Sequence, residues 1–255
     1  MNNKMVYYQK KESIAIITLD KEPSRNAIDV KIAEEIKDIG NKISLDNDIS
    51  VIVIKGDESF CLGIGRDELS LFENKAQLIR SLSIASIIEQ FDQPTIAAIN
   101  GDTFGQGLEL ALACDLRICS ETAHFSMDHL SHGDIPWDGG TQRLPRIVGK
   151  GKAMEQILTG EVIDAQEARR AGIVHRVVPD GELLTVVMDM AREIATKSTI
   201  AVRYAKEAIS KGMDLTLEQG LRLEADLYFL LHTTKDRTEG IKAFREKRPP
   251  RFKGR

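Results

Sequence analysis

An apolar run that leads into a glycine-rich turn constrains this chain more than any other feature. Residues 95–99, Thr-Ile-Ala-Ala-Ile, predict a buried β-strand, and Gly101, Gly105 and Gly107 follow it. From Leu108 onward the residues favour a helix. A strand, a glycine turn and a helix start together aim free backbone N–H groups at negative charge.

Glu109 lies in the first turn of that predicted helix. A carboxylate beside backbone donors is a candidate catalytic group, because the donors stabilise developing negative charge while the carboxylate moves a proton. The same pattern also fits a tight connection whose glutamate only complements the helix dipole. Spacing alone leaves both interpretations open.

The whole chain alternates strands with helices and then becomes helical, which indicates an α/β class. Residues 183–247 predict three helices, with breaks near residues 198–199 and 212. Residues 125–140 resist a regular assignment and combine Gly, Pro, Asp, His and Trp, which favours a wall of a binding site. Strands are predicted at residues 13–19, 51–56, 95–99, 116–119 and 172–178, and helices from Asp29 to about residue 43, from residue 68 to about 91, and at 141–149 and 152–158.

Composition narrows the classes of function. A chain of 255 residues with 42% hydrophobic and 29% charged residues fits one sizeable globular domain, with or without a small appendage. The net charge of −4 argues against a nucleic-acid partner. Three cysteines without metal spacing favour a reducing compartment, and no signal segment or apolar run of about 18 residues is present. We therefore expect a cytoplasmic protein with no membrane partner.

Other motifs were tested against the chain. Residues 63–65 lack the third glycine of a dinucleotide fingerprint, and residues 101–107 lack the Lys-Ser/Thr ending of a phosphate loop. No Gly-x-Ser-x-Gly elbow occurs. His124, His129 and His132 invite a metal hypothesis, but no Cys or carboxylate partner stands at recognisable spacing, so no metal is expected.

Several blocks, in the same order along nearly the whole chain, resemble the crotonase (enoyl-CoA hydratase/isomerase) superfamily. The central block is Gln-Pro-Thr-Ile-Ala-Ala-Ile-Asn-Gly at residues 93–101. The other matching blocks are residues 60–63, 109–111, 114–115, 139–145, 158–160, 168–174, 239–240 and 244–248.

The resemblance implies a crotonase-like spiral of ββα turns with a C-terminal helical trimerisation region. The expected division is a CoA-binding and catalytic core at residues 1–195 and a helical oligomerisation region at residues 196–255. The assembly would be a homotrimer or a dimer of trimers. The substrate would be an acyl-CoA thioester, with no cofactor beyond the coenzyme A of that substrate.

The resemblance also implies an oxyanion hole formed by the backbone N–H groups of Ile64 and Gln106, beside Gly105 in the substrate pocket. In characterised enzymes, one such donor contributes about 3–4 kcal/mol to lowering the barrier. Glu109 matches the first catalytic glutamate of hydratases. Gln106 replaces a usual glycine, Ile64 a usual alanine and Gly65 a usual aspartate, so we expect a reshaped pocket.

The second glutamate of ordinary hydratases falls at His129. His129 can replace the lost acid, bind substrate or be a structural loop residue. Asp138 stands where a small residue is usual, and its Trp-Asp-Gly-Gly context resembles dihydroxynaphthoyl-CoA synthases and ring-opening hydrolases. Asp138 can orient water, protonate carbon or merely begin a turn. Trp137 fits an apolar wall for a flat or cyclic acyl group.

Three residues match positions near the CoA nucleotide in relatives, namely Arg25, Ala27 and Lys247. Each basic residue alone would also fit an ordinary surface position.

Hydration of an enoyl-CoA or a cyclic dienoyl-CoA is the leading hypothesis, because Glu109 is retained. The alternative is C–C bond hydrolysis, ring closure or isomerisation of a β-ketoacyl- or dienoyl-CoA, which depends on Asp138; simple isomerases of the family rely on the missing second glutamate. A third hypothesis is a non-enzymatic RNA-binding protein, which the acidic net charge disfavours.

Overall fold

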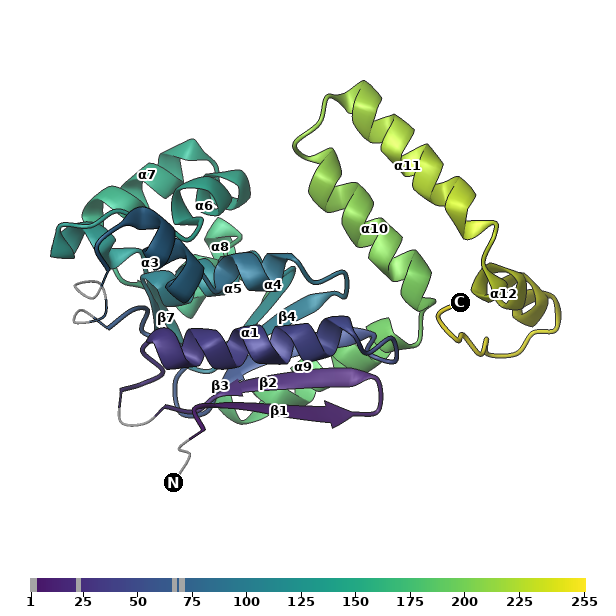
Figure 1. Cartoon of the computed structure of the whole chain (residues 1–255), viewed down its shortest axis with the longest axis horizontal. Helices are drawn as coiled ribbons and strands as arrows, with labels where there is room; N and C mark the ends of the chain where they lie inside the picture. The colour runs from purple at the N-terminus through teal and green to yellow at the C-terminus, as the bar shows by residue number, and fades with distance from the viewer. Residues whose placement is uncertain (1–3, 22–23, 66–67, 69–71) are drawn as a thin grey trace.

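A six-stranded sheet with helices on both faces forms the body of the molecule, and three helices extend from it to one side (Figure 1). The computed structural model describes residues 4–21, 24–65, 68 and 72–255. The strand order is β1-β2-β3-β4-β6-β9, with β1 antiparallel to β2 and the other neighbours parallel. These strands are β1 (Val6–Lys11), β2 (Ile14–Leu19), β3 (Val51–Gly56), β4 (Thr95–Ile99), β6 (Leu116–Ser120) and β9 (Arg176–Val178).

A second, three-stranded sheet lies next to the glycine turn. Its β5 (Thr103–Phe104) pairs in parallel with β7 (His124–Ser126), and β7 pairs antiparallel with β8 (Ile163–Asp164). This sheet fixes the turn that follows β4 and therefore the start of the helix after it.

The two faces of the large sheet are covered by different helices. One face meets α1 (Val30–Ser44), α3 (Lys75–Leu82), α4 (Ala85–Glu89) and α5 (Gln106–Ala113), and the other meets α9 (Leu183–Ala195). Because both faces are buried, the parallel strands read as nearly continuous apolar runs. The remaining helices are α6 (Gly140–Val148), α7 (Lys150–Thr159), α8 (Ala165–Ala171), α10 (Thr199–Gly212), α11 (Leu217–Leu231) and α12 (Lys235–Arg245), with 3₁₀ turns η1 (Asp128–His132) and η2 (Asp180–Glu182).

The predicted elements agree with the structure at the strands of the core and differ at three places. The helix predicted from residue 68 to about 91 is divided into α3 and α4, because the backbone is extended at Ser83; residues 69–71 of that prediction lie outside the described residues. The strand predicted at residues 172–178 is shorter, since β9 contains only its last three residues. The helical end contains four helices instead of three, because the chain breaks again after α11. Thr234 caps α12 by accepting a hydrogen bond from the backbone of Arg237, which starts a new helix.

Helices α10, α11 and α12 form an arm that stands away from the sheet (Figure 1). Lys206 anchors the arm to the body through an ion pair of 2.8 Å with Asp115. The buried carboxylate of Asp236 accepts hydrogen bonds from Ser198 and from the backbone of the C-terminal tail. Apolar side chains on the arm remain exposed, among them Leu217 at 79% and Phe244 at 86%.

Two sequence expectations concern membranes and metals. Within the described ranges, every helix is too short or too polar to cross a membrane. The same residues contain no cluster of three or more His, Cys, Asp or Glu side chains that would hold a metal ion.

We predict that the three cysteines react only after unfolding. Cys61, Cys114 and Cys119 are buried free thiols, and burial raises the pKa of each to about 12. At pH 8 a thiol with such a pKa is ionised in only about one molecule in ten thousand. Iodoacetamide followed by intact-mass measurement should therefore detect no modification of the folded protein and three modifications in denaturant. Rapid labelling of Cys61 in the folded state would contradict this.

Candidate active site

Two loops lie against each other at the start of α5. The backbone N–H of Phe104 donates to the Cys61 carbonyl at 3.1 Å. A Cβ atom added to Gly63 would lie 2.9 Å from the backbone nitrogen of Gln106, and Gly63 itself has φ +79°. Glycine is thus required here both for its backbone conformation and for the close approach of the two loops.

This approach places two unused backbone donors next to each other. Ile28 bonds to the residues on either side of Ile64, accepting from the Gly65 N–H and donating to the Gly63 carbonyl. Gln106 is the first residue of α5, so its N–H has no acceptor inside the helix. Across the part of the chain that the structure describes, neither the Ile64 nor the Gln106 N–H donates to a protein acceptor. The two N–H groups are free to bind an oxyanion.

Glu109 lies one helical turn after Gln106 and is completely buried. Its Oε1 accepts hydrogen bonds from the backbone N–H groups of Asp138 at 2.9 Å and Gly140 at 2.7 Å. A Cβ atom at Gly140 would lie 3.0 Å from this oxygen. The backbone at the start of α6 therefore fixes Oε1, whereas Oε2 accepts no hydrogen bond from the described residues.

His129 faces that second oxygen. Its Nε2 lies 3.3 Å from Glu109 Oε2, a contact within ion-pair range that is not aligned as a hydrogen bond. The ring is 7% exposed, and neither ring nitrogen has a hydrogen-bond partner among the described residues. A Cβ atom at Gly105 would lie 3.7 Å from the ring, so the imidazole lies beside the glycine turn. Glu109 and His129 form a buried pair whose free polar atoms can bind substrate or water.

Asp138 is placed differently from Glu109. Its carboxylate accepts hydrogen bonds from the Ser83 hydroxyl at 2.5 Å, the backbone N–H groups of Ile84 and Ala85 at 3.0 Å each, and the Gln106 side-chain amide at 2.9 Å. Three of these donors bond to Oδ2, and the Ser83 hydroxyl bonds to Oδ1. The carboxylate is thus held by protein donors on both oxygens.

Burial raises the pKa of the Asp138 carboxyl, the hydrogen bonds from Ser83, Gln106 and Ala85 lower it, and the nearby Glu109 charge raises it further. Trp137, next to it, is partly buried and contacts the main hydrophobic core. The structure thus brings Ile64, Gly105, Gln106, Glu109, His129, Trp137 and Asp138 into one region.

The predicted CoA residues are not all together. Arg25 pairs with Asp102 and is half exposed, and the Ala27 carbonyl accepts from Lys21 at 3.0 Å. Lys247 comes two residues after the end of α12, and α12 lies on the arm, away from α1 (Figure 1). A single chain therefore does not bring Lys247 to Arg25 and Ala27.

Sequence reasoning missed two participants. The side chain of Gln106 and the hydroxyl of Ser83 both bind Asp138. No local signal pointed to them, because Ser83 is 55 residues and Gln106 is 32 residues from Asp138 along the chain.

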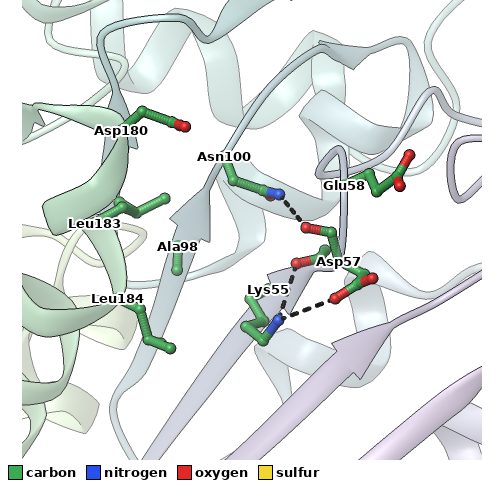
Figure 2. Close-up of a pocket in the computed structure, with 9 residues that line it drawn as sticks. Lys55, Asp57, Glu58, Ala98, Asn100, Asp180, Leu183 and Leu184 are labelled. Atoms are coloured by element: carbon green, nitrogen blue, oxygen red, sulfur yellow. Dashed lines mark hydrogen bonds and ion pairs between the residues drawn. The ribbon is translucent and has the colours of Figure 1, made fainter.

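A small cavity of about 270 Å³ lies elsewhere, at the carboxyl ends of β3 and β4 beside α9 (Figure 2). None of the predicted site residues lines it. Its walls are formed by Lys55, Gly56, Asp57, Glu58, Ala98, Asn100, Asp180, Leu183 and Leu184.

Comparison with known proteins places the chain among acyl-CoA enzymes. The family model described as "Enoyl-CoA hydratase/isomerase" matches residues 9–255. A crotonyl-CoA hydratase from Syntrophomonas wolfei is 36% identical over 97% of each chain. A 2,3-dehydroadipyl-CoA hydratase from Escherichia coli is also 36% identical, over 96% of this chain and 97% of its own.

The fold agrees with this match. The crystal structure of an enoyl-CoA hydratase from Bacillus anthracis superposes with a TM-score of 0.91 at 39% identity, covering 98% of this chain and 100% of that one. The predicted crotonase-like α/β fold is confirmed.

We predict that Gly107→Ala destabilises the protein while Gly151→Ala does not. Both glycines are the second residue of a helix, α5 and α7 respectively. A Cβ atom at Gly107 would lie 2.1 Å from the Cys61 carbonyl oxygen, whereas Gly151 has nothing within 4 Å. Urea denaturation should show a loss of about 1–3 kcal/mol for Gly107→Ala. Gly151→Ala should be neutral or gain up to about 1 kcal/mol. Equal effects would contradict the tight approach of the two loops.

Proposed function

The chain belongs to the enoyl-CoA hydratase/isomerase family, and from this premise we propose that Glu109 and two backbone donors add water across the double bond of an enoyl-CoA. The observation that carries the proposal is the geometry at the start of α5. A buried carboxylate with one oxygen fixed by two N–H groups lies one turn below a free N–H. Hydration needs both a base for water and donors for the thioester oxygen.

The proposed reaction uses one proton twice. Glu109 takes a proton from water as the hydroxide oxygen bonds to the β-carbon. The π electrons of the double bond shift onto the thioester oxygen, and the N–H groups of Ile64 and Gln106 stabilise the resulting enolate. Glu109 then returns the proton to the α-carbon, so that one complete water molecule is added.

His129 has a supporting role in this proposal. It is next to Glu109 Oε2 and has no other polar partner among the described residues. From there His129 can hydrogen-bond the attacking water and orient it toward the β-carbon. The missing second glutamate is therefore not an obstacle to hydration, because the proton balance closes on Glu109 alone.

The contacts of Asp138 favour hydration over C–C bond hydrolysis or ring closure. That alternative requires a carboxylate that can reach substrate or water, and the carboxylate of Asp138 already accepts four hydrogen bonds. A cyclic dienoyl-CoA remains our finer proposal for the acyl group, supported by the partly buried Trp137, which directly precedes Asp138. Comparing kcat/KM for crotonyl-CoA and a cyclic dienoyl-CoA tests this choice.

The exposed apolar residues of the arm support a proposal for subunit assembly, and the position of Lys247 on the arm supports one for CoA binding. We propose that residues 196–255 form the trimer or dimer-of-trimers contact, because Leu217, Phe229 and Phe244 expose large apolar surfaces there. Arg25 and Ala27 would hold the nucleotide of the CoA, and Lys247 would reach it from a neighbouring subunit.

We predict that Glu109→Gln lowers the kcat for crotonyl-CoA hydration by about 10²–10⁴-fold, the usual contribution of a positioned general base. Loss of the ultraviolet absorbance of the enoyl thioester measures the reaction. Glu193→Gln, a change at an exposed glutamate of α9, is the matched control and should leave kcat unchanged. Full activity in Glu109→Gln would refute the proposed mechanism.

We predict a smaller loss for His129→Gln than for Glu109→Gln, because glutamine can still hydrogen-bond the water while no proton needs to pass through this position. His129→Leu, which removes that hydrogen bond, should lower kcat further than His129→Gln. The same absorbance assay ranks the three variants. If His129→Gln is as inactive as Glu109→Gln, His129 itself transfers a proton.

A further inference from the structure

The side chain of Gln106 is buried and fully engaged as a donor. Gln106 is 1% exposed, and its Nε2 donates to the Leu82 carbonyl at 2.7 Å and to Asp138 at 2.9 Å. The family resemblance gives a glycine at this position and a small residue at position 138. Two of the departures of this chain from the family pattern, Gln106 and Asp138, are therefore in direct contact.

Asp138 extends this contact to the junction of α3 and α4. Ile84, which precedes α4, gives that helix no side-chain cap. The Asp138 carboxylate takes that part instead, since it accepts from the N–H groups of Ile84 and Ala85 and from the Ser83 hydroxyl. An unpaired buried carboxylate would be costly, and these donors remove that cost.

The backbone of Asp138 is tied to the catalytic glutamate. Its N–H donates to Glu109 Oε1, and its carbonyl accepts from Arg143 at 2.8 Å. Asp138 thus contacts both the side chain of Gln106, which supplies a proposed oxyanion donor, and the carboxylate of Glu109, the proposed base. The group formed by Gln106, Asp138, Ser83 and the N–H groups of Ile84 and Ala85 is called the Asp138 clamp below.

We infer that the Asp138 clamp is a positioning device: the side chains of Gln106 and Asp138 hold the Gln106 N–H and the Glu109 carboxylate in register without touching the reacting atoms. This inference rests on the proposed hydration, because its benefit is the placement of donor and base. Misplacement by about 1 Å can cost about a hundredfold in rate. Asp138 is accordingly a positioning residue and not an acid or base in the reaction.

The mutual dependence of the two side chains gives the sharpest test. Gln106→Gly leaves the buried Asp138 carboxylate with one donor fewer, and Asp138→Ala leaves the Gln106 amide with an unpaired N–H. The double variant Gln106→Gly/Asp138→Ala removes both groups and restores the residue types of the family. We expect each single variant to lower kcat at least about tenfold, with KM changing less, and the double variant to recover part of that loss.

The experiment measures kcat, KM and the pH dependence of kcat for crotonyl-CoA in the wild type, both single variants and the double variant. Asp189→Asn, at an exposed position of α9, is the control for unchanged activity. The number of ionisations that govern kcat should stay the same in every variant, because Asp138 transfers no proton. Loss of an ionisation in Asp138→Ala, or losses that simply multiply in the double variant, would overturn the inference.

Hydrogen–deuterium exchange provides a readout that does not depend on the reaction. In Asp138→Ala, exchange should accelerate in the peptides that contain residues 82–89 and 106–113. In the double variant it should slow again only in residues 106–113, because the N–H groups of Ile84 and Ala85 still lack their acceptor. If the wild type hydrates no enoyl-CoA, the proposed function fails while this pattern still tests the clamp. If a variant does not fold, Ser83→Ala gives a milder perturbation of the same clamp, and unchanged exchange in Ser83→Ala would count against it.

Discussion

The buried carboxylate of Glu109 is the group on which the rest of the site depends. A charge without solvent is tolerated only where it is paired or hydrogen-bonded, and here two backbone N–H groups at the start of α6 bond to one oxygen. The α6 start must approach α5 closely to do this, which leaves no room for a side chain at Gly140. The fold therefore positions the proposed base with backbone N–H groups, whose geometry is less adjustable than that of a side chain.

Positioning by backbone groups also explains the glycine turn before α5. The proposed oxyanion donors at Ile64 and Gln106 are backbone N–H groups, so bulky side chains at both positions leave these donors in place. What the side chains alter is the surrounding support. The Gln106 side chain bonds to Asp138 and to the Leu82 carbonyl at the end of α3. A hydrogen-bonded network thus takes the place of the close packing that a glycine would allow. The amide N–H groups of Gln106 are both used in this network, whereas its buried Oε1 has no hydrogen-bond partner among the described residues.

The sequence predicted the part of this arrangement that local patterns encode. The strand at 95–99, the glycine turn and the helix start followed from apolar runs and glycine spacing, and the family resemblance assigned Ile64, Gln106 and Glu109 to one pocket. The role of Asp138 was not accessible, because its partners Ser83 and Ala85 lie more than fifty residues away along the chain. The third break in the helical end, at Thr234, was missed because a capping threonine also fits a helix interior.

Position 129 shows how a departure from the family can be tolerated by the chemistry. Two glutamates beside each other would repel, and their protons would be shared between them. A histidine 3.3 Å from Glu109 Oε2 is neutral or positive, so it does not oppose the charge on Glu109. The carboxylate then remains available as a base without a competing anion. Replacement of the second glutamate by His129 removes an acid from the site, but it also places a side chain without negative charge beside the remaining carboxylate.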